Sequence, residues 1–390
     1  MADQLTSPAV PRHRRRLRLA GRFVARLLAS LLAAVALLAL VTPDGRYVAR
    51  AAWEEGKILA RRRPIAAVIA DSAGTSPAER RSLQLVVDAR RFALDSLQLT
   101  GGESFTTYSR LERDTLVLLL SAARRDTLAP FTWWFPVVGR FPYKGYFDHA
   151  QAVRIAASMR EAGYDTYVRP ASAFSTLGWF NDPLLSTTLR LDSLDLAGTV
   201  IHELTHNTLF VRGQVTFNES FASFVGTRGA IAFFRARGQL RAVRQLEAEW
   251  RDEKLLGSFW GATLSAIDSA YATHPADSAA RVAARDTVFE RMRRRLLDEV
   301  APRLPTVPRA RLERLPLDNA FLLARRVYAA DLWVFDAVHE RLGGSVQASV
   351  ALLSRLARDQ PADPFGALHR WLDEHPSGAV VSGGTTPGPS

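Results

Sequence analysis

The spacing of apolar positions in the first half of the chain predicts a mixture of helices and strands. Residues 47–70 have helical spacing for most of their length. A second amphipathic pattern runs from Ser76 to about residue 97, and it begins with a capping box, Ser-Pro-Ala-Glu. Residues 115–122 are an uncharged apolar run typical of a buried strand, and 164–170 are expected to form another. A short helix is expected between them, over 149–162.

From about Ser193 onward the pattern is almost entirely helical. It is interrupted at Gly213, at Pro275, at residues 302–308 and at the Gly-Gly pair 343–344. The last residues, 377–390, are rich in Gly, Pro, Ser and Thr and are expected to be disordered. The chain is therefore predicted to be an α+β protein, predominantly α-helical, with a small mixed sheet ahead of a larger helical segment.

Near the N-terminus an apolar segment follows a basic one. Residues 27–41 contain no charge, and residues 1–26 contain seven arginines against one acid, Asp3. This order is typical of a secretory signal or a signal anchor, whose basic end stays in the cytoplasm. Ala-Leu-Val at 39–41 is a poor cleavage site, which favours an uncleaved anchor over a cleaved signal. A buried core helix is the other alternative, since the run is short for a full span.

This pattern divides the chain into four parts. They are a basic cytoplasmic region at 1–26, a membrane-anchor helix at 27–42, a folded domain at 43–376 and the tail at 377–390. The folded domain is expected on the extracytoplasmic side, in the periplasm or cell envelope, tethered to the membrane by the N-terminal helix.

Composition and charge then narrow the chemistry. Of the 390 residues 47% are hydrophobic and 23% charged, which is enough for a buried core and excludes global disorder. The chain has no cysteine, so disulfides and thiol nucleophiles are excluded, and any metal must be held by His, Asp or Glu. The net charge is +12, of which seven arginines minus one aspartate give +6 in residues 1–26. This distribution does not indicate a nucleic-acid partner.

One motif in the helical half points to metal chemistry. Residues 202–206 read His-Glu-Leu-Thr-His, and two histidines four residues apart lie on one face of a helix, where both imidazoles can reach one zinc ion. Glu203, beside the first histidine, is placed to take a proton from a water on that ion and to act as general base. The alternative is a chance match of the motif. A chance match would seldom fall on an uncharged and well-capped helix, so the metal interpretation is favoured.

Two histidines leave a catalytic zinc one protein ligand short. The metzincin extension would need glycine and histidine at 209 and 212, where the chain has Leu209 and Arg212. The next candidate is Glu219, thirteen residues after His206. If Gly213 makes a turn and Thr216 caps a second, antiparallel helix, Glu219 in its first turn would point at the imidazoles. The alternative is an acid that complements the dipole of that first turn.

These residues resemble those of the Glu-type zincins, the thermolysin-like class of metallopeptidases. More closely, the chain resembles the bacterial putative aminopeptidase family of HExxH zinc peptidases. The stretches that carry this resemblance are 47–65, 133–148, 163–187, the zinc segment through Phe224, and 317–328. The chain has no counterpart of the Gly-Ala-Met-Glu-Asn strand of well-known zinc aminopeptidases, and Ser223 stands where thermolysin has an aspartate.

The resemblance implies a zincin-like catalytic domain with His202, His206 and Glu219 as Zn²⁺ ligands and Glu203 as base. A helical tyrosine steadies the oxyanion in related enzymes, which makes Tyr328 the first candidate for that role. Tyr143 and Tyr146 are alternatives, and a core tyrosine is the other reading of Tyr328. Residues 164–177 are a candidate edge strand along which a peptide could bind.

The function expected from the sequence is therefore zinc-dependent hydrolysis of peptide bonds, with peptides or proteins as substrates. The resemblance implies that the enzyme is an aminopeptidase. Two rivals remain open: a non-catalytic binding module with a structural zinc, and an envelope maturation factor. Asp331 and Asp336 are expected on a charged helix surface, and His339 on a solvated helix face.

Overall fold

The computed structural model describes residues 22–24, 26–31, 34, 37, 41–111, 117–135, 139–170 and 183–376. The chain divides into two compact units, Met1–Arg61 and Arg62–Ser390. The predicted disordered tail at 377–390 lies outside the described residues.

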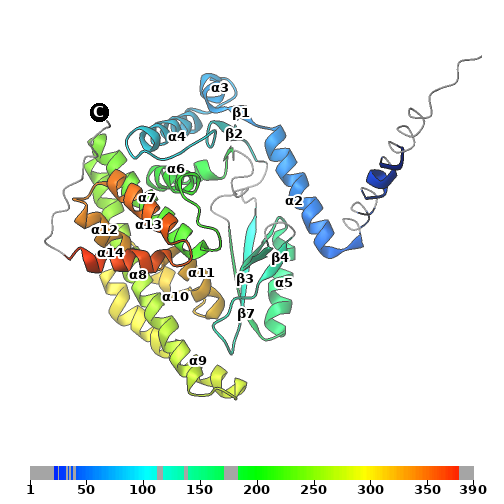
Figure 1. Ribbon diagram of the computed structural model, residues 1–390, viewed down its shortest axis with the longest axis vertical. Helices are drawn as coiled ribbons and strands as arrows, with labels where there is room; N and C mark the ends of the chain where they lie inside the picture. Colours follow the sequence, from blue (N-terminus) through cyan, green and yellow to red (C-terminus); the bar gives the residue numbers. More distant parts are fainter. Residues whose placement is uncertain are drawn as a thin grey trace, which may run out of the picture. The chain divides into compact units, whose positions relative to one another are not determined.

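The first unit contains helix α2, Pro43–Ala60 (Figure 1). Thr42 is its N-cap, because the threonine hydroxyl accepts a hydrogen bond from the N–H of Gly45 at 2.9 Å. No helix formed by the described residues is long and apolar enough to span a membrane. Of the expected anchor, residues 32, 33, 35, 36 and 38–40 lie outside the described ranges. The anchor therefore stays a prediction.

The second unit is mainly helical with small sheets, in agreement with the predicted α+β class. The helix expected over 47–70 is interrupted, because Pro64 has no backbone N–H and disfavours helical backbone at Arg63. Ser76 begins the next helix as predicted, accepting from the N–H of Glu79 at 3.2 Å. The α-helices are α3 Ile65–Ala70, α4 Pro77–Asp95, α5 His149–Glu161, α6 Ser193–Thr208, α7 Val215–Ala236, α8 Leu240–Ala272, α9 Ser278–Arg295, α10 Arg309–Glu313, α11 Asn319–Ala329, α12 Leu332–Arg341, α13 Val346–Asp359 and α14 Pro364–Glu374. Three short helices, η1 Thr188–Arg190, η2 Leu296–Val300 and η3 Ala301–Arg303, complete the set.

The described strands form three small sheets. The first has the order β1–β2–β8, the second β6–β3–β7 and the third β4–β5. In the second sheet all pairs are antiparallel, and β7 pairs with β3 along its whole length. The strands are β1 Arg63–Pro64, β2 Thr107–Ser109, β3 Leu118–Arg124, β4 Trp133–Phe135, β5 Gly139–Phe141, β6 Tyr143–Tyr146, β7 Tyr164–Pro170 and β8 Leu184–Leu185. The strand expected over 164–170 is confirmed, and the one expected over 115–122 is shifted to 118–124.

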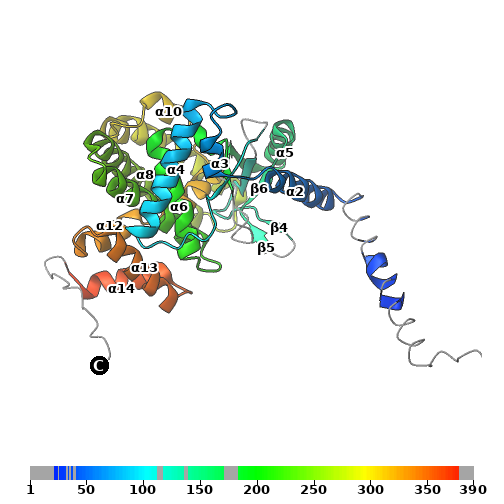
Figure 2. The same ribbon diagram turned by 90° about the horizontal axis from the view of Figure 1, so that it is seen from above.

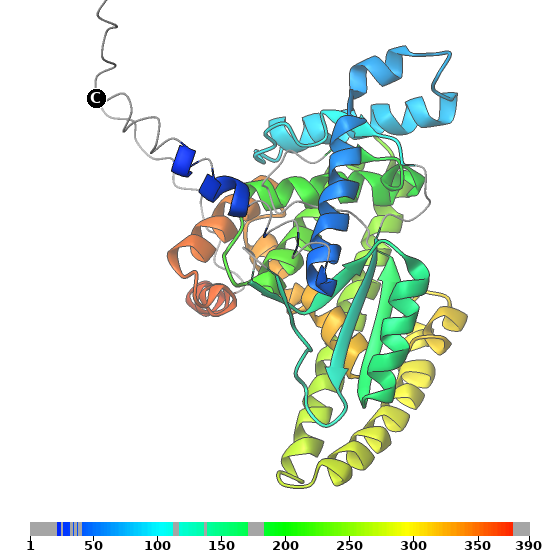
Figure 3. The same ribbon diagram turned by 90° about the vertical axis from the view of Figure 1, so that its right-hand side faces the viewer.

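Helices cover both faces of the β6–β3–β7 sheet. On one face Val168 packs against a buried cluster that includes Ala152 and Ala156 of α5, and Figure 3 shows α5 running along the strands. On the other face the ring of Tyr167 meets Phe321 of α11 edge to face, with centroids 5.2 Å apart. Successive residues of a strand point to opposite faces, so Arg169 lies on the α11 side with Tyr167.

Two large hydrophobic clusters hold the helices together. The first joins α4, α6 and α7 to α12, α13 and α14, and these last three helices lie together in Figure 2. Phe217, Phe221 and Phe224 of α7 are completely buried in it, as their helical spacing predicts, and Phe335 of α12 contacts all three rings. The second cluster joins the later part of α8 to α9, η2 and α11.

Helices α6 and α7 are in close contact at Gly226. A Cβ placed on Gly226 of α7 would lie 2.9 Å from the carbonyl oxygen of Gly198 and 3.0 Å from the Cβ of His202, both on α6. Both neighbours belong to or adjoin the backbone and cannot move aside. A Cβ on Gly198 would lie 3.8 Å from the nearest atom, which is ordinary van der Waals contact. Gly226 therefore sets the spacing of the two helices.

We expect Gly226→Ala to lower the free energy of unfolding by about 1–3 kcal/mol, because the added methyl group pushes α7 away from α6. Gly198→Ala is the matched control, since its methyl group fits and alanine favours the helix by up to about 1 kcal/mol. Equilibrium unfolding in urea measures both variants. A Gly226→Ala protein as stable as the parent would show that the contact does not fix the spacing.

Candidate metal centre

Helix α6 carries the two histidines of the motif. Asp192 is its N-cap, and one carboxylate oxygen of Asp192 accepts from the N–H groups of Leu194 and Asp195 at 2.8 and 2.9 Å. His202 and His206 follow on one side of the helix, with ring centroids 5.0 Å apart. Buried apolar residues on the other sides hold α6 in the core. The backbone that carries the two imidazoles is therefore held in place.

The turn between α6 and α7 is tied by one asparagine. Gly213 lies in this turn with φ +80°, a conformation that glycine adopts readily. The side chain of Asn218 accepts from the N–H of Val211 at 2.9 Å and donates to the carbonyl oxygen of Val211 at 2.8 Å. The prediction that Thr216 caps the second helix is wrong, because the helix begins at Val215 with Gln214 as its N-cap.

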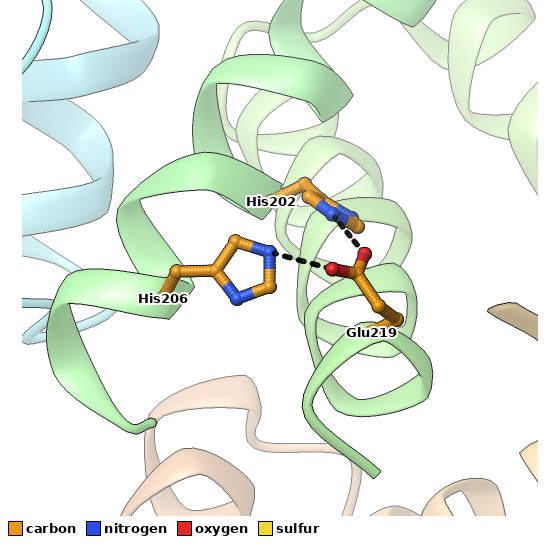
Figure 4. A group of neighbouring side chains, drawn as sticks. All are labelled: His202, His206 and Glu219. Carbon is orange, nitrogen blue, oxygen red and sulfur yellow. Dashed lines mark ion pairs between the residues drawn. The ribbon is translucent and has the colours of Figure 1, made fainter. Parts of the chain in front are cut away.

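This earlier start moves Glu219 from the expected first turn of the helix to the second. From there its carboxylate faces both imidazoles (Figure 4). One carboxylate oxygen lies 3.5 Å from Nε2 of His202, and the other lies 3.8 Å from Nε2 of His206. The ligand atoms of the three residues all lie within 4.8 Å of one another. Complementing the first-turn dipole does not account for Glu219 in this position.

These spacings fit a zinc ion. Two ligand atoms about 2.1 Å from a tetrahedral ion lie about 3.4 Å apart, close to the separations of 3.5 and 3.8 Å in the structure. Two imidazole nitrogens and one carboxylate are also donors that zinc accepts. In the described part of the chain, the group that could hold a metal consists of these three residues. Each side chain keeps about a fifth of its surface exposed, 20% for His202, 22% for His206 and 21% for Glu219, so solvent can reach the group.

The surroundings shift the pKa values of the three side chains in different directions. Burial lowers the pKa of His206 to about 4, with the neighbouring His202 adding to the effect, so His206 is neutral at pH 7. Burial opposes ionisation of Glu219, but the hydrogen bond to His202 and the nearby histidines outweigh it and lower the pKa of the carboxyl group. Burial also lowers the pKa of His202, but Glu219 and Glu203 raise it more. Glu203 is half-buried on α6.

Arg169 was missing from the site residues predicted from the sequence. It lies near the end of β7, half-buried, on the sheet face that α11 covers, and its positive charge helps to lower the pKa of Glu219. Its signal in the sequence is weak: it stands within one of the stretches that resemble the family, next to Pro170. Residues 171–177, the rest of the expected edge strand, lie outside the described ranges.

Helix α11 brings Tyr328 into the neighbourhood of the group. Tyr328 is in the last turn of α11, and two residues later the N–H of Ala330 donates to the hydroxyl of Ser220 at 3.2 Å. Ser220 is completely buried and adjoins Glu219. The side chain of Tyr328 lies outside the described part of the structure. The alternative tyrosines, Tyr143 and Tyr146, are on β6, across the sheet from β7.

The other end of α11 is held by buried polar groups. The N–H of Asn319 donates to the carboxylate of Asp165 on β7 at 3.1 Å, and Arg285 of α9 pairs with the same carboxylate at 3.0 Å. Asp318 is the N-cap and accepts from the N–H of Phe321 at 2.8 Å. Burial raises the pKa of Asp318 to about 7, and the charge of Asp165 adds to the effect while the Phe321 N–H opposes it.

Two expectations for α12 are corrected. Asp336 is buried, with 3% of its surface exposed. Its carboxylate accepts hydrogen bonds from Arg228 of α7 and from Trp250 and Lys254 of α8. His339 is 7% exposed and its Nδ1 lies 2.9 Å from the hydroxyl of Ser349. Both residues were expected on exposed faces. The sequence pattern of α12 does not show that they are buried, because their partners lie on other helices. Asp331 is exposed as expected.

The family comparison covers the part of the chain that carries these three residues. The family model described as "Putative aminopeptidase" matches residues 46–367, which include every residue of the metal group. The chain therefore belongs to the putative aminopeptidase family. Searches of the curated proteins and of the solved structures returned no match.

We expect the stability of the protein to depend on pH through Asp318. Because its pKa is raised on folding from 3.8 to about 7, the protonated form stabilises the fold below about pH 4, and this contribution is lost as the pH rises through 7. Asp318→Asn keeps a capping oxygen without the charge. At pH 8 this variant should be more stable than the parent by about 1 kcal/mol or more, and the gap should close toward pH 4. Urea unfolding across this range measures the gap, and a gap independent of pH would contradict the assignment.

Proposed function

We propose that the protein is a zinc-dependent peptidase that hydrolyses peptide bonds with water. The observation that carries this proposal is the approach of Glu219 on α7 to His202 and His206 on α6, with Glu203 on the same helix as the histidines. His202, His206 and Glu219 would hold Zn²⁺ in a zincin-like domain, and the family name supports peptide substrates.

Zinc, when bound, supplies a Lewis acid that polarises a carbonyl group and lowers the pKa of water in the site. The carboxylate of Glu203 accepts the proton of the attacking water and passes it to the nitrogen of the leaving amine as the peptide C–N bond breaks. The hydroxyl of Tyr328 donates to the oxygen on which negative charge develops. Arg169 is a further fixed positive charge close to Glu219.

The rival proposal of a non-catalytic module with structural zinc has less support. Structural zinc sites are closed by four protein ligands, whereas here three candidate ligands lie together in the described residues and each stays partly exposed. A maturation factor of the envelope would use the same chemistry on a protein partner. We place the catalytic domain outside the cytoplasm, tethered by residues 27–42, on the strength of the basic and apolar segments.

Two isosteric variants should separate the base from the ligand. Glu203→Gln should retain zinc but lose peptidase activity about 100-fold or more, because the amide cannot accept the proton. Glu219→Gln should lose both zinc and activity, because a neutral amide is a poor zinc ligand. Metal content after dialysis and the rate of cleavage of a peptide library measure both. A Glu203→Gln protein that cleaves at the parent rate would disprove the mechanism.

We expect Tyr328→Phe to lower kcat about 100-fold with little change in KM and in zinc content, because only the transition state loses a hydrogen bond. Tyr143→Phe is the matched control and should keep the parent kcat. If the loss of kcat follows the Tyr143 variant instead, the oxyanion donor lies on β6.

A further inference from the structure

Helix α2 exposes a continuous apolar face. At 100° per residue Val48, Ala49, Ala52, Trp53 and Gly56 fall within an arc of about 140°, and all five are exposed. Trp53 keeps 63% of its surface exposed and Val48 keeps 43%. Exposed apolar side chains that lie next to one another, unlike single ones, are typical of an interaction surface.

Charged residues lie on the flank of this face. Arg46, Arg50 and Lys57 follow next to Trp53 around the helix. Glu54 lies beyond them, is 6% exposed, and pairs with Arg50 at 2.7 Å and Lys57 at 2.5 Å. The helix therefore presents an apolar face with a basic border on the Trp53 side, while Glu55, half-buried, borders the face on the Val48 side.

The apolar face continues the apolar segment ahead of it in the chain. Only Thr42 separates α2 from Val41, the last residue of the uncharged run at 27–41. The large apolar side chains described in this region are all highly exposed, between 52 and 69%; they are Phe23, Val24, Leu27, Leu28, Leu31, Leu37 and Val41. Basic residues precede this region as well, at Arg22 and Arg26.

We propose that α2 lies on an anionic lipid surface, with the Val48–Trp53 face in the boundary between headgroups and acyl chains. Tryptophan prefers this boundary, where its ring is apolar and its N–H stays hydrated. The basic border matches anionic headgroups, to which Lys and Arg near the surface are attracted. A second copy of the chain or another protein would not require the basic border. The proposal does not depend on the peptidase activity.

The absence of native cysteine allows a direct test in the full-length protein. Single cysteines at Ala49→Cys and Ala52→Cys place a nitroxide label on the apolar face, and Arg50→Cys is the matched control on the basic border. The protein is reconstituted into vesicles of phosphatidylglycerol and phosphatidylcholine. Collision rates of each label with oxygen and with a water-soluble nickel chelate are then measured by electron paramagnetic resonance.

We expect the labels at 49 and 52 to collide several-fold more with oxygen than with nickel, and the label at 50 to show the reverse. In vesicles of phosphatidylcholine alone the labels at 49 and 52 should move toward water. Equal nickel access at all three positions would overturn the proposal, as would equal depth in the two lipid compositions. Dipolar broadening at 52 that persists at high lipid excess would assign the face to a second copy, and loss of access to both reagents would assign it to another protein.

Discussion

The candidate metal centre depends on how closely two helices approach each other. His202 and His206 belong to α6 and Glu219 to α7, so the distance between these helices sets the distance between the three candidate ligands. Gly226 permits that distance, because a side chain there would meet the backbone at Gly198 and the Cβ of His202 itself. Asn218 then fixes the register of α7 by bonding both backbone groups of Val211. Spacing and register together bring the carboxylate to the imidazoles.

The remaining helices hold this pair in place through buried polar contacts. Asp336 joins α12 to α7 and α8, and its pKa is lowered because Lys254 and Arg228 outweigh the effect of burial. An unpaired carboxylate in this position would be costly, so α12 and α8 are tied to the helix that carries Glu219. Helix α11 is held at both ends, by Asp165 on β7 and by Ser220 beside Glu219. It therefore connects the sheet to the candidate metal centre.

Local rules explain which parts of this arrangement the sequence could predict. A helix places residues i and i+4 on one face wherever it lies, so the pairing of His202 with His206 follows from their spacing alone. The cap at Ser76 and the strand at 164–170 are equally local. The start of α7 was missed by two residues, because Gln214 precedes the first turn without a side-chain cap. The position of Asn218 has no local signal.

What the sequence determined by itself is a helix with two histidines and a glutamate, an apolar segment after seven arginines, and an α+β chain without cysteine. Only the tertiary structure decided that Glu219 faces these histidines, that Arg169 lies near it, and that Asp336 and His339 are buried. The physical reason is that helical periodicity fixes neighbours within four residues. The partners of a buried charge come from helices that are distant in sequence, as Arg228 and Asp336 are, and their contact exists only after the core has packed.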